Sequence, residues 1–593
     1  MKRILLLAVV SAAWGIAATE DGAALFQTHC AMCHKEPPVN RAPLPEALSK
    51  LPVDQIRRSM DSGSMKEQST ALNAEQRTAI VAHIARNTSP QPAANAGRCA
   101  PDYEPRTDST YWNGWGVDVE NTRFQPEKMA GIKAADIPKL QLKWAFGLPN
   151  SPVAAAQPAM FAGRLFFGSN DGTVYATDAK TGCIIWTFKA AASVRSAITF
   201  GVVSNANPAA MFGDTQANVY AVAVKTGQLV WKLKVDDHPV ARITGSPKMH
   251  GSRLYVPVSS IEEVTGGAPK YECCKFRGSV VAIDIESGKQ VWKSYTIPDP
   301  PTPTKKNADG VQLHGPAGAA VWLSPTLDLK QRLVIVGTGN GYSDPANKYT
   351  DAVIAFDMDT GAMKWVRQLA ANDGWNFACI NPNKANCPEK SGPDVDIGAS
   401  PILRNLPNGK RVLLVGQKSG VVHGLDPDED GKILWQTRIG QGGALGGVQW
   451  GMAADVQNVY VALSDVHLRA KAGGLFALKI SDGSRVWHAI PPPPPCAGKF
   501  GCSPAQMAPL TVIPGIVLAG SMDGVLRAHD AKTGKLVWEF NTARDFDTIN
   551  GVKAKGGSLS ATGPVLANGM MFVNSGYGTL GGMPGNVLLA FAP

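Results

Sequence analysis

A short phrase recurs along most of this chain and limits how the chain can fold. In residues 175–186, an apolar stretch that ends in Ala-Thr-Asp leads into a Thr-Gly turn, and a Trp follows shortly afterwards. Such a phrase predicts two short strands joined by a tight turn at glycine. The complete copies are residues 175–186, 220–231, 281–292, 354–365, 422–435, 476–487 and 527–538. Repeats of this length, with four short strands in each, predict the blades of a β-propeller with Trp packed between blades.

An eighth copy is divided between the two ends of this repeat region. Residues 586–592 end the chain where a turn and a Trp should follow, and residues 140–146 supply an isolated strand with Trp144. Pairing the last strand with the first would close the ring and remove an exposed sheet edge. We therefore expect an all-β, eight-bladed propeller over residues 110–593. The repeated Trp and Gly residues indicate architecture and say nothing about chemistry.

The segment ahead of the propeller carries a haem attachment motif, Cys30-Ala-Met-Cys33-His34. Both thiols can add to the haem vinyl groups, and the adjacent imidazole can bind the iron. A thioredoxin-like motif would follow a strand, and a zinc site would need two further ligands nearby; neither pattern is present. Residues 20–88 are predicted to form a small all-α class I cytochrome c domain with one haem c, and residues 89–109 a linker. Asn73 is the expected N-cap of its last helix, with Gln76 three residues on.

An electron-transfer haem of this type needs a second axial ligand, often a methionine. Met60 and Met65 are the candidates. Met65 follows Ser-Gly-Ser ahead of the last helix, and we favour it as the ligand, whereas Met60 suits a core position.

The first residues predict export. Lys2 and Arg3 precede a short apolar run, which suggests a signal peptide over residues 1–18, too short to span a membrane. We expect a periplasmic or secreted protein with no transmembrane segment. Disulfides can form in that compartment, and two pairs, Cys379/Cys387 and Cys496/Cys502, could each close a short loop. The net charge is +10, but no dense basic run interleaves with aromatics, so nucleic acid is not an expected partner.

The Trp phrase resembles the tryptophan-docking repeat of pyrroloquinoline quinone (PQQ) dehydrogenases. A haem domain ahead of the propeller is similar to the polyvinyl-alcohol dehydrogenase (cytochrome) group, as are the phrases at residues 271–278, 336–342 and 446–451. The resemblance implies a dehydrogenase with PQQ and Ca²⁺ that oxidises secondary alcohol groups, in particular those of polyvinyl alcohol. Electrons would pass to its own haem and then to an external cytochrome c.

The resemblance also assigns site residues one by one. Trp322 would form the floor under PQQ, and Asn340, eighteen residues later, would bind Ca²⁺ with Glu262 or Glu263. Glu262 fits the family spacing slightly better. Further matches are Lys418 beside the quinone oxygens, Arg195 and Thr244 on the PQQ carboxylates, and Gln449 and Trp450 along the pocket.

One position departs from the family pattern. The family's proposed base is an aspartate, but Asn376 stands at the aligned position and cannot take a proton as a carboxylate would. Asp373 or the metal-site glutamate could replace it, while Asn376 could orient substrate or bind the metal. The family's adjacent-cysteine disulfide lies earlier in the ring, so we do not carry its role over to Cys273 and Cys274.

Two other functions are consistent with parts of the sequence. A non-enzymatic propeller scaffold shares the blade phrase, but it needs neither a haem nor the pair Trp322 and Asn340. A related quinohaemoprotein could act on a small alcohol or sugar, and the width of the pocket would distinguish it.

Overall fold

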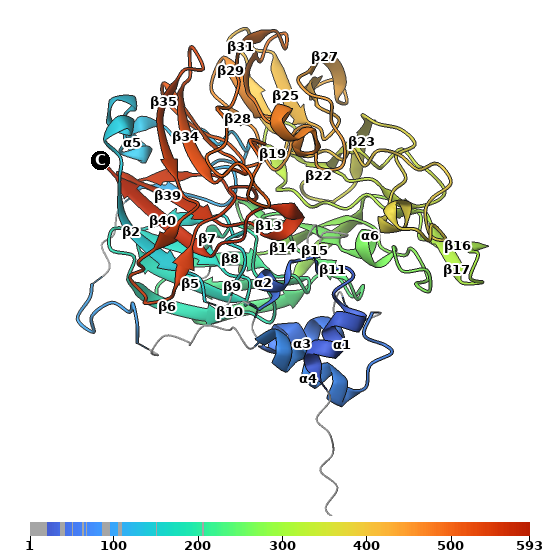
Figure 1. Ribbon diagram of the computed structural model, residues 1–593. Helices are drawn as coiled ribbons and strands as arrows, with labels where there is room; N and C mark the ends of the chain where they lie inside the picture. Colours follow the sequence, from blue (N-terminus) through green and yellow to red (C-terminus); the bar gives the residue numbers. More distant parts are fainter. Residues whose placement is uncertain are drawn as a thin grey trace, which may run out of the picture.

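The computed structural model describes residues 21–35, 42–49, 51, 53–61, 65–66, 68–85, 95–104, 109–149, 151–203 and 207–593. It contains a small helical domain and a large ring of sheets (Figure 1). The predicted signal peptide and parts of the predicted linker lie outside the described residues. No helix in the described ranges is long and apolar enough to cross a membrane.

The helical domain packs around one small apolar core. Its helices are α1 (Gly22–His29), α2 (Pro45–Leu48), α3 (Val53–Asp61) and α4 (Ala74–Ala85). Asn73 and Gln76 bond each other's backbone N–H groups at 2.8 and 3.0 Å, which confirms the predicted cap of α4. Gly22 lies against α4, where a Cβ would stand 2.1 Å from the carbonyl oxygen of Ala79, so α1 and α4 cross closely. The buried core consists of Phe26, Leu48, Ile56, Met60, Leu72, Ile80 and Val81.

The sheets are eight four-stranded antiparallel blades, as the repeats predict. Blade 1 contains β3 (Ala159–Phe161), β4 (Arg164–Gly168), β5 (Thr173–Asp178) and β6 (Ile184–Lys189), with β1 (Tyr111–Trp112) beside β3; blade 2 contains β7 (Thr199–Val203), β8 (Asn207–Gly213), β9 (Asn218–Ala223) and β10 (Leu229–Lys234). Blade 3 contains β12 (Lys248–His250), β13 (Arg253–Ser260), β14 (Ser279–Asp284) and β15 (Gln290–Tyr295), with β11 (Ala241–Arg242) beside β13; blade 4 contains β19 (Thr326–Asp328), β20 (Leu333–Gly337), β22 (Ala352–Asp357) and β23 (Met363–Gln368).

The second half of the ring repeats the same order. Blade 5 contains β24 (Ile402–Asn405), β25 (Arg411–Gly416), β26 (Val421–Asp426) and β27 (Lys432–Arg438); blade 6 contains β28 (Ala453–Ala454), β29 (Asn458–Ala462), β30 (Leu475–Lys479) and β31 (Arg485–Ala489). Blade 7 contains β32 (Thr511–Ile513), β33 (Ile516–Gly520), β34 (Val525–Asp530) and β35 (Leu536–Asn541); blade 8 contains β38 (Val565–Ala567), β39 (Met570–Ser575), β40 (Val587–Ala592) and β2 (Gln141–Gly147). Short elements in the connections are α5 (Glu127–Ala130), α6 (Glu262–Thr265), η1 (Ala134–Lys139), η3 (Phe377–Ile380), η4 (Val466–Lys471), η5 (Thr579–Gly581), β16 (Thr302–Lys306), β17 (Gln312–Gly315), β18 (Ala317–Gly318), β21 (Gly341–Ser343), β36 (Asp545–Phe546) and β37 (Ala554–Lys555).

The ring closes through the divided blade. β2 pairs with β40 in antiparallel register, with Trp144 opposite Ala590. The last strand of the chain is therefore covered by a strand from the start of the propeller, which confirms the predicted closure and leaves β40 without an open edge.

Seven of the eight repeat Trp residues pack on the turn glycine of the next blade, whereas Trp538 packs on Phe591 of blade 8. The Trp186 indole N–H donates to the carbonyl oxygen of Val224 at 2.9 Å, and its ring lies where a Cβ on Gly227 would be, at 2.7 Å. Gly227 also has φ of +72°, which side chains disfavour. Trp144 packs in the same way on Gly182 and so joins blade 8 to blade 1. The repeated Trp and Gly residues therefore hold neighbouring blades together.

Residues 111–125 fill the axis of the propeller. They contact the innermost strand of every blade, which no repeat pattern predicts. The contacts are Tyr111 and Trp112 with β3, Asn113 with Phe200, Asp118 with Lys248, Val119 with Leu327, Glu120 with Leu403, Thr122 with Ala454, Arg123 with Val512 and Gln125 with Leu566. Arg123 is fully buried and donates to the carbonyl oxygens of Leu510 and Trp115. This segment thus closes the central channel.

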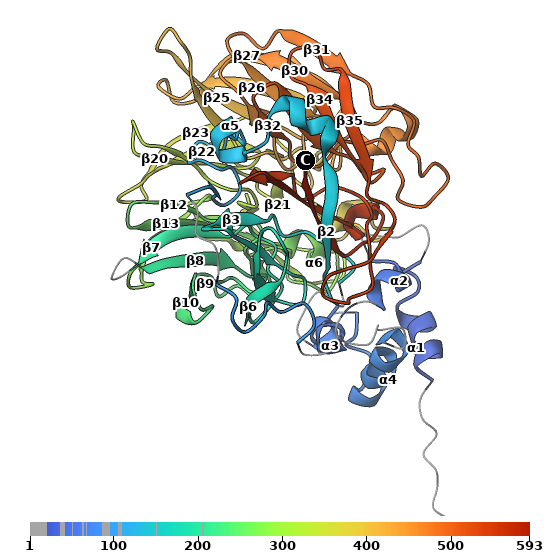
Figure 2. The same ribbon diagram turned by 90° about the vertical axis from the view of Figure 1, so that its left-hand side faces the viewer.

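The helical domain lies beside the propeller in both views, with α2 nearest to the ring of sheets (Figures 1 and 2). Glu46 on α2 pairs with Lys555 on β37, with 2.8 Å between Oε1 and Nζ. Lys555 belongs to the connection that leads into the innermost strand of blade 8, so the helical domain lies at the end of the propeller where such connections gather.

Eight of the ten cysteines form four disulfides, Cys99–Cys183, Cys273–Cys274, Cys379–Cys387 and Cys496–Cys502. The last two confirm the expected short loops. Cys99–Cys183 ties the chain to blade 1 soon after it leaves the helical domain.

Candidate active site

The two remaining cysteines are Cys30 and Cys33, the pair expected to hold haem. His34 follows them, is 7% exposed, and its Nδ1 lies 2.7 Å from the carbonyl oxygen of Pro43. Donation from Nδ1 to that oxygen leaves Nε2 as the ring nitrogen with a lone pair for iron. Both free thiols and an oriented imidazole therefore meet the requirements for covalent haem.

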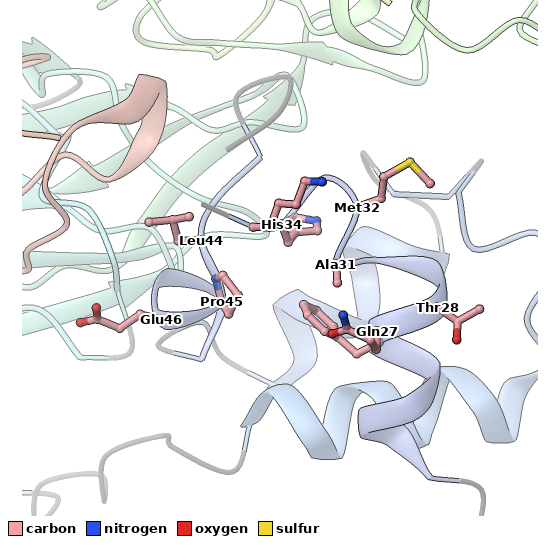
Figure 3. A pocket seen from close by; sticks show the side chains of 10 residues that line it. Gln27, Thr28, Ala31, Met32, His34, Leu44, Pro45 and Glu46 are labelled. Atoms are coloured by element: carbon pink, nitrogen blue, oxygen red, sulfur yellow. The ribbon is translucent and has the colours of Figure 1, made fainter. Parts of the chain in front are cut away.

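A cavity of about 650 Å³ adjoins this motif. Its lining is Phe26, Gln27, Thr28, Ala31, Met32, His34, Lys35, Leu44, Pro45 and Glu46. In Figure 3, Gln27 on α1 and Ala31 just after it face Pro45 across the cavity, with His34 above them. Its size is in the range of cofactor pockets. Glu46, which pairs with Lys555, lies on this rim, so the cavity adjoins the propeller.

Both candidate axial methionines belong to the same domain core. Met60 is 6% exposed at the end of α3, and Met65 packs partly buried against the core. The Met65 backbone N–H donates to the carbonyl oxygen of Ser59 at 2.8 Å, which holds its loop beside α3. The choice of Met65 stays a prediction.

A second pocket lies on the propeller axis. Trp115, Ala155, Arg195, Thr244, Gly245, Ser246, Trp322, Leu323, Ser324, Trp450 and Ala561 line it. Four residues predicted from the sequence, Arg195, Thr244, Trp322 and Trp450, thus meet in one place. They precede the innermost strands of blades 2, 3, 4 and 6, so the pocket lies at the same end of the ring as Lys555 and the helical domain. Gln449 is not among the lining residues. Its amide nitrogen donates to the carbonyl oxygen of Gly446 at 3.0 Å.

Aromatic and basic side chains fill most of this pocket. The rings of Trp322 and Trp450 meet edge to face with centroids 5.4 Å apart, and the Arg195 guanidinium lies 5.1 Å from the Trp450 ring. The free volume is about 20 Å³. Arg195 from the blade 2 side and Trp450 from the blade 6 side therefore fill most of the space beside Trp322.

A buried ion network lies directly beside Trp322. Its indole N–H donates to Asp396 at 3.1 Å, and Lys418 lies 2.9 Å from both Asp396 and Asp394. The other Asp396 oxygen accepts the backbone N–H of Asn340 at 2.9 Å. Lys418 is thus held next to the aromatic floor by two carboxylates, as a cationic partner of a quinone would require.

Two more buried aspartates surround this network. Burial raises the pKa of Asp373, whose carboxylate accepts the backbone N–H groups of Asp394 and Val395 at 2.9 and 2.6 Å. Burial, and then the charge of Asp396, raise the pKa of Asp351 well above its usual range. Neither Asp351 carboxyl oxygen has a hydrogen-bond partner among the described residues. Asp373 thus shapes the 394–396 loop, and the buried position of Asp351 favours its protonated form.

The oxygen donors expected for a metal come from two loops. The Asn340 amide nitrogen donates to the carbonyl oxygens of Trp375 and Gly341 at 2.6 and 3.1 Å, so its Oδ1 points the opposite way. Glu262, in α6, is fully buried and accepts from the backbone N–H groups of Lys275 and Phe276 at 2.8 and 2.7 Å.

Glu263, the other expected candidate, lies near the Asn340 loop. Burial first, and then the charge of Glu263, raise the pKa of Tyr342 well above its usual range. Tyr342 follows Asn340 by two residues. Glu263 therefore has its charge close to this loop, while Glu262 is committed to the turn that follows Cys274.

Asn376 serves as a structural cap. It is fully buried, its Oδ1 accepts the backbone N–H of Ala378 at 2.8 Å, and its Nδ2 donates to the carbonyl oxygens of Tyr342 and Asn386 at 2.9 and 2.8 Å. The sulfurs of Cys273 and Cys274 lie 3.9 and 3.8 Å from the same Tyr342 carbonyl oxygen. This disulfide thus packs beneath the Asn340 loop.

Several residues at the site have no counterpart in the sequence predictions. They are Trp115, Arg242, Tyr342, Asp351, Asp394 and Asp396. One signal was available, the pair of aspartates two residues apart, although the left-handed φ of +59° at Asp394 interrupts the alternation of an extended chain. Trp115 and Arg242 lie outside the repeats and carried no such signal.

Comparison with known proteins agrees with both parts of the chain. The family model of the glucose/ethanol/alcohol dehydrogenase β-propeller domain matches residues 112–439, more than half of the chain. The model of cbb3-type cytochrome c oxidase subunit III matches residues 17–84, and that of outer membrane protein assembly factor BamB matches residues 349–584.

Relatives of nearly full length carry one name. The chain is 40% identical to a polyvinylalcohol dehydrogenase of Pseudomonas sp., over 96% of this chain and 93% of the relative. It is 39% identical to a polyvinylalcohol dehydrogenase of Sphingopyxis sp. (strain 113P3), over 96% and 92%.

Among solved structures, the quinohemoprotein alcohol dehydrogenase ADHIIG of Pseudomonas putida HK5 superposes with a TM-score of 0.61 and 18% identity. The match covers 84% of this chain and 83% of that one. This likeness supports the fold. Together with the haem motif and the pocket around Trp322, the comparisons show that the chain belongs to the polyvinylalcohol dehydrogenase family of PQQ-dependent quinohaemoprotein dehydrogenases.

Proposed function

We propose that this protein is exported, oxidises secondary alcohol groups of polyvinyl alcohol, and passes the electrons from its haem to an external cytochrome c. The observation that carries the proposal is that Lys418 and Asp396 contact Trp322 beside the axial pocket, at the end of the propeller where the haem domain lies. The names of the two nearly full-length relatives support the polymer as substrate.

When bound, PQQ supplies a two-electron acceptor and haem c a one-electron carrier. The donor set of the axial pocket fits this quinone: Trp322 provides a flat face, Lys418 a fixed positive charge, and Arg195 and Thr244 groups that bind carboxylates. Residues 111–125 fill the axis and Trp115 lines the pocket, so this segment limits the entry of water along the axis.

We further propose that Asp396 takes the proton of the substrate hydroxyl. Asn376 uses both ends of its amide in structural bonds, and the Asp373 carboxylate accepts from the 394–395 backbone instead of from Trp322. Asp396 is the carboxylate bonded to the floor residue Trp322 and paired with Lys418. In Asp396→Asn we expect kcat to fall by roughly 10²- to 10⁴-fold with PQQ still bound. An unchanged kcat in Asp396→Asn would contradict the assignment of Asp396 as the base.

For calcium, we propose Asn340 Oδ1 and Glu263 as protein ligands, in place of Glu262. A hard divalent ion prefers such oxygens, and the bonds of Glu262 to the 275–276 backbone occupy its carboxylate. In the PQQ-loaded protein, Glu263→Gln should weaken Ca²⁺ affinity, measured by titration after chelation. Glu262→Gln should lower thermal stability instead. The reverse pattern would return the role to Glu262.

The experiment that tests the substrate uses the haem-containing protein reconstituted with PQQ and Ca²⁺. We expect haem reduction on addition of polyvinyl alcohol, followed by transfer to an added cytochrome c. Reduction by small alcohols or sugars but not by polymer would contradict the polymer assignment and favour a small-molecule dehydrogenase.

A further inference from the structure

Arg242 lies beside the axial pocket and has no role so far. It belongs to β11, which pairs with β13 so that Arg242 stands opposite Ser259. Its neighbours Ala241 and Ile243 are buried in the core between blades, while Thr244 lines the pocket. Because side chains alternate along an extended chain, Arg242 shares the pocket side with Thr244.

Within the part of the chain that the structure describes, the guanidinium of Arg242 has no counterion. Among the described residues, neither Arg242 nor the nearby Arg195 forms a side-chain hydrogen bond or an ion pair, and the Nε of Arg242 is buried. The buried Arg411 differs, since it pairs with Asp328 and Asp428 at 2.7 and 2.5 Å. Arg242 as a whole is half-buried, but withdrawing its Nε from water without a partner is costly, so this arrangement favours an anion from outside.

The surrounding charges strengthen this argument. Burial, and then the positive charge of Arg195, lower the pKa of Arg242 to about 10. The phenol of Tyr342 also affects the pKa of Arg242. Burial raises the pKa of Tyr342 itself, which favours the neutral phenol. Two guanidinium groups thus lie close together beside a pocket wall, with no carboxylate between them.

We propose that Arg242 binds a carboxylate of the quinone cofactor, so that Arg195 and Arg242 together form a two-guanidinium anion subsite. Five N–H donors on each planar guanidinium suit bidentate bonds to carboxylate. The inference rests on the proposed function, because it takes PQQ as the ligand of the axial pocket. It adds a binding residue that the family resemblance does not supply.

The test measures cofactor affinity in the haem-containing full chain without PQQ, by quenching of tryptophan fluorescence at fixed Ca²⁺. We expect Arg242→Gln to weaken PQQ binding by roughly 10- to 100-fold, since it removes a charge-assisted hydrogen bond. Arg242→Lys should recover only part of the affinity, because lysine keeps the positive charge but lacks the paired N–H donors of the planar guanidinium. Arg253→Gln, which removes a surface partner of Asp284, is the matched control and should bind PQQ as the wild type does.

Methyl-esterified PQQ separates charge recognition from a folding defect. The wild type should prefer the free acid over the ester, and Arg242→Gln should lose most of that preference whatever its stability. An undiminished preference in Arg242→Gln, or unchanged PQQ affinity, would overturn the inference. A wild-type protein that binds neither form would instead contradict the proposed function.

Discussion

Asp351→Asn offers a sharp test of the buried acid network. Asp351 is fully buried, both of its oxygens lack a hydrogen-bond partner among the described residues, and Asp396, Asp373 and Asp394 lie close enough to act on its charge. Burial and these charges raise its pKa well above the usual range, while Lys418 opposes them. The folded protein therefore keeps a proton on Asp351 at pH values where the unfolded chain has released it.

The direction of the pH dependence of stability follows from proton binding. A folded state that binds more protons than the unfolded state loses stability as pH rises above the usual aspartate pKa of about 4, until pH reaches the folded pKa. The slope is roughly 1.4 kcal/mol per pH unit for one proton. Asparagine has the same shape and no proton to lose. Above pH 5, the wild type should therefore lose stability relative to Asp351→Asn, by at most this slope, until the pH reaches the folded pKa.

The assay is urea unfolding of the propeller transition, followed by circular dichroism at pH 5, 6 and 7. Asp547→Asn, a change at an exposed aspartate, controls for net charge. Curves for the wild type and Asp351→Asn that run parallel across this pH range would refute the reasoning, because they would mean that Asp351 is ionised in the folded protein.

Two further predictions concern the ring and the haem. Gly288→Ala should lower the free energy of unfolding by roughly 2–4 kcal/mol, and Gly251→Ala by about 1 kcal/mol. Both glycines have a left-handed φ, of +68° and +57°. Only at Gly288 would the added Cβ meet a ring, that of Trp231 at 2.6 Å. Equal losses would show that Trp packing on glycine contributes nothing. Met65→Leu should abolish the methionine-to-iron charge-transfer absorption and Met60→Leu should preserve it; the opposite result would assign Met60 as ligand.

The blades were predictable because their signals are local. Each copy of the phrase has its own turn glycine and Trp, and the strand with Trp144 needed a partner that residues 586–592 lacked. The Cys30/Cys33/His34 motif is equally local. Such features depend only on residues that are close in the sequence, so one amino-acid sequence is enough to predict them.

The interior of the site was less predictable, because long-range contacts create it. Asp396 meets Trp322 and Asn340 only after blades 4 and 5 pack together. Residues 111–125 contact all eight blades through hydrogen bonds that do not recur at a regular spacing in the sequence. Asn376 looked like a replaced base, yet in the fold its amide caps η3, which only the three-dimensional bonds reveal.

The most direct measurement of the central claim is a single turnover under anaerobic conditions. The haem-containing protein, loaded with PQQ and Ca²⁺, is mixed with polyvinyl alcohol without any external acceptor, and the haem spectrum is followed. We predict that the haem becomes reduced in the wild type, and that Trp322→Ala, which removes the aromatic floor, binds PQQ weakly and leaves the haem oxidised. A wild-type haem that stays oxidised, or one reduced equally well in Trp322→Ala, would contradict the account.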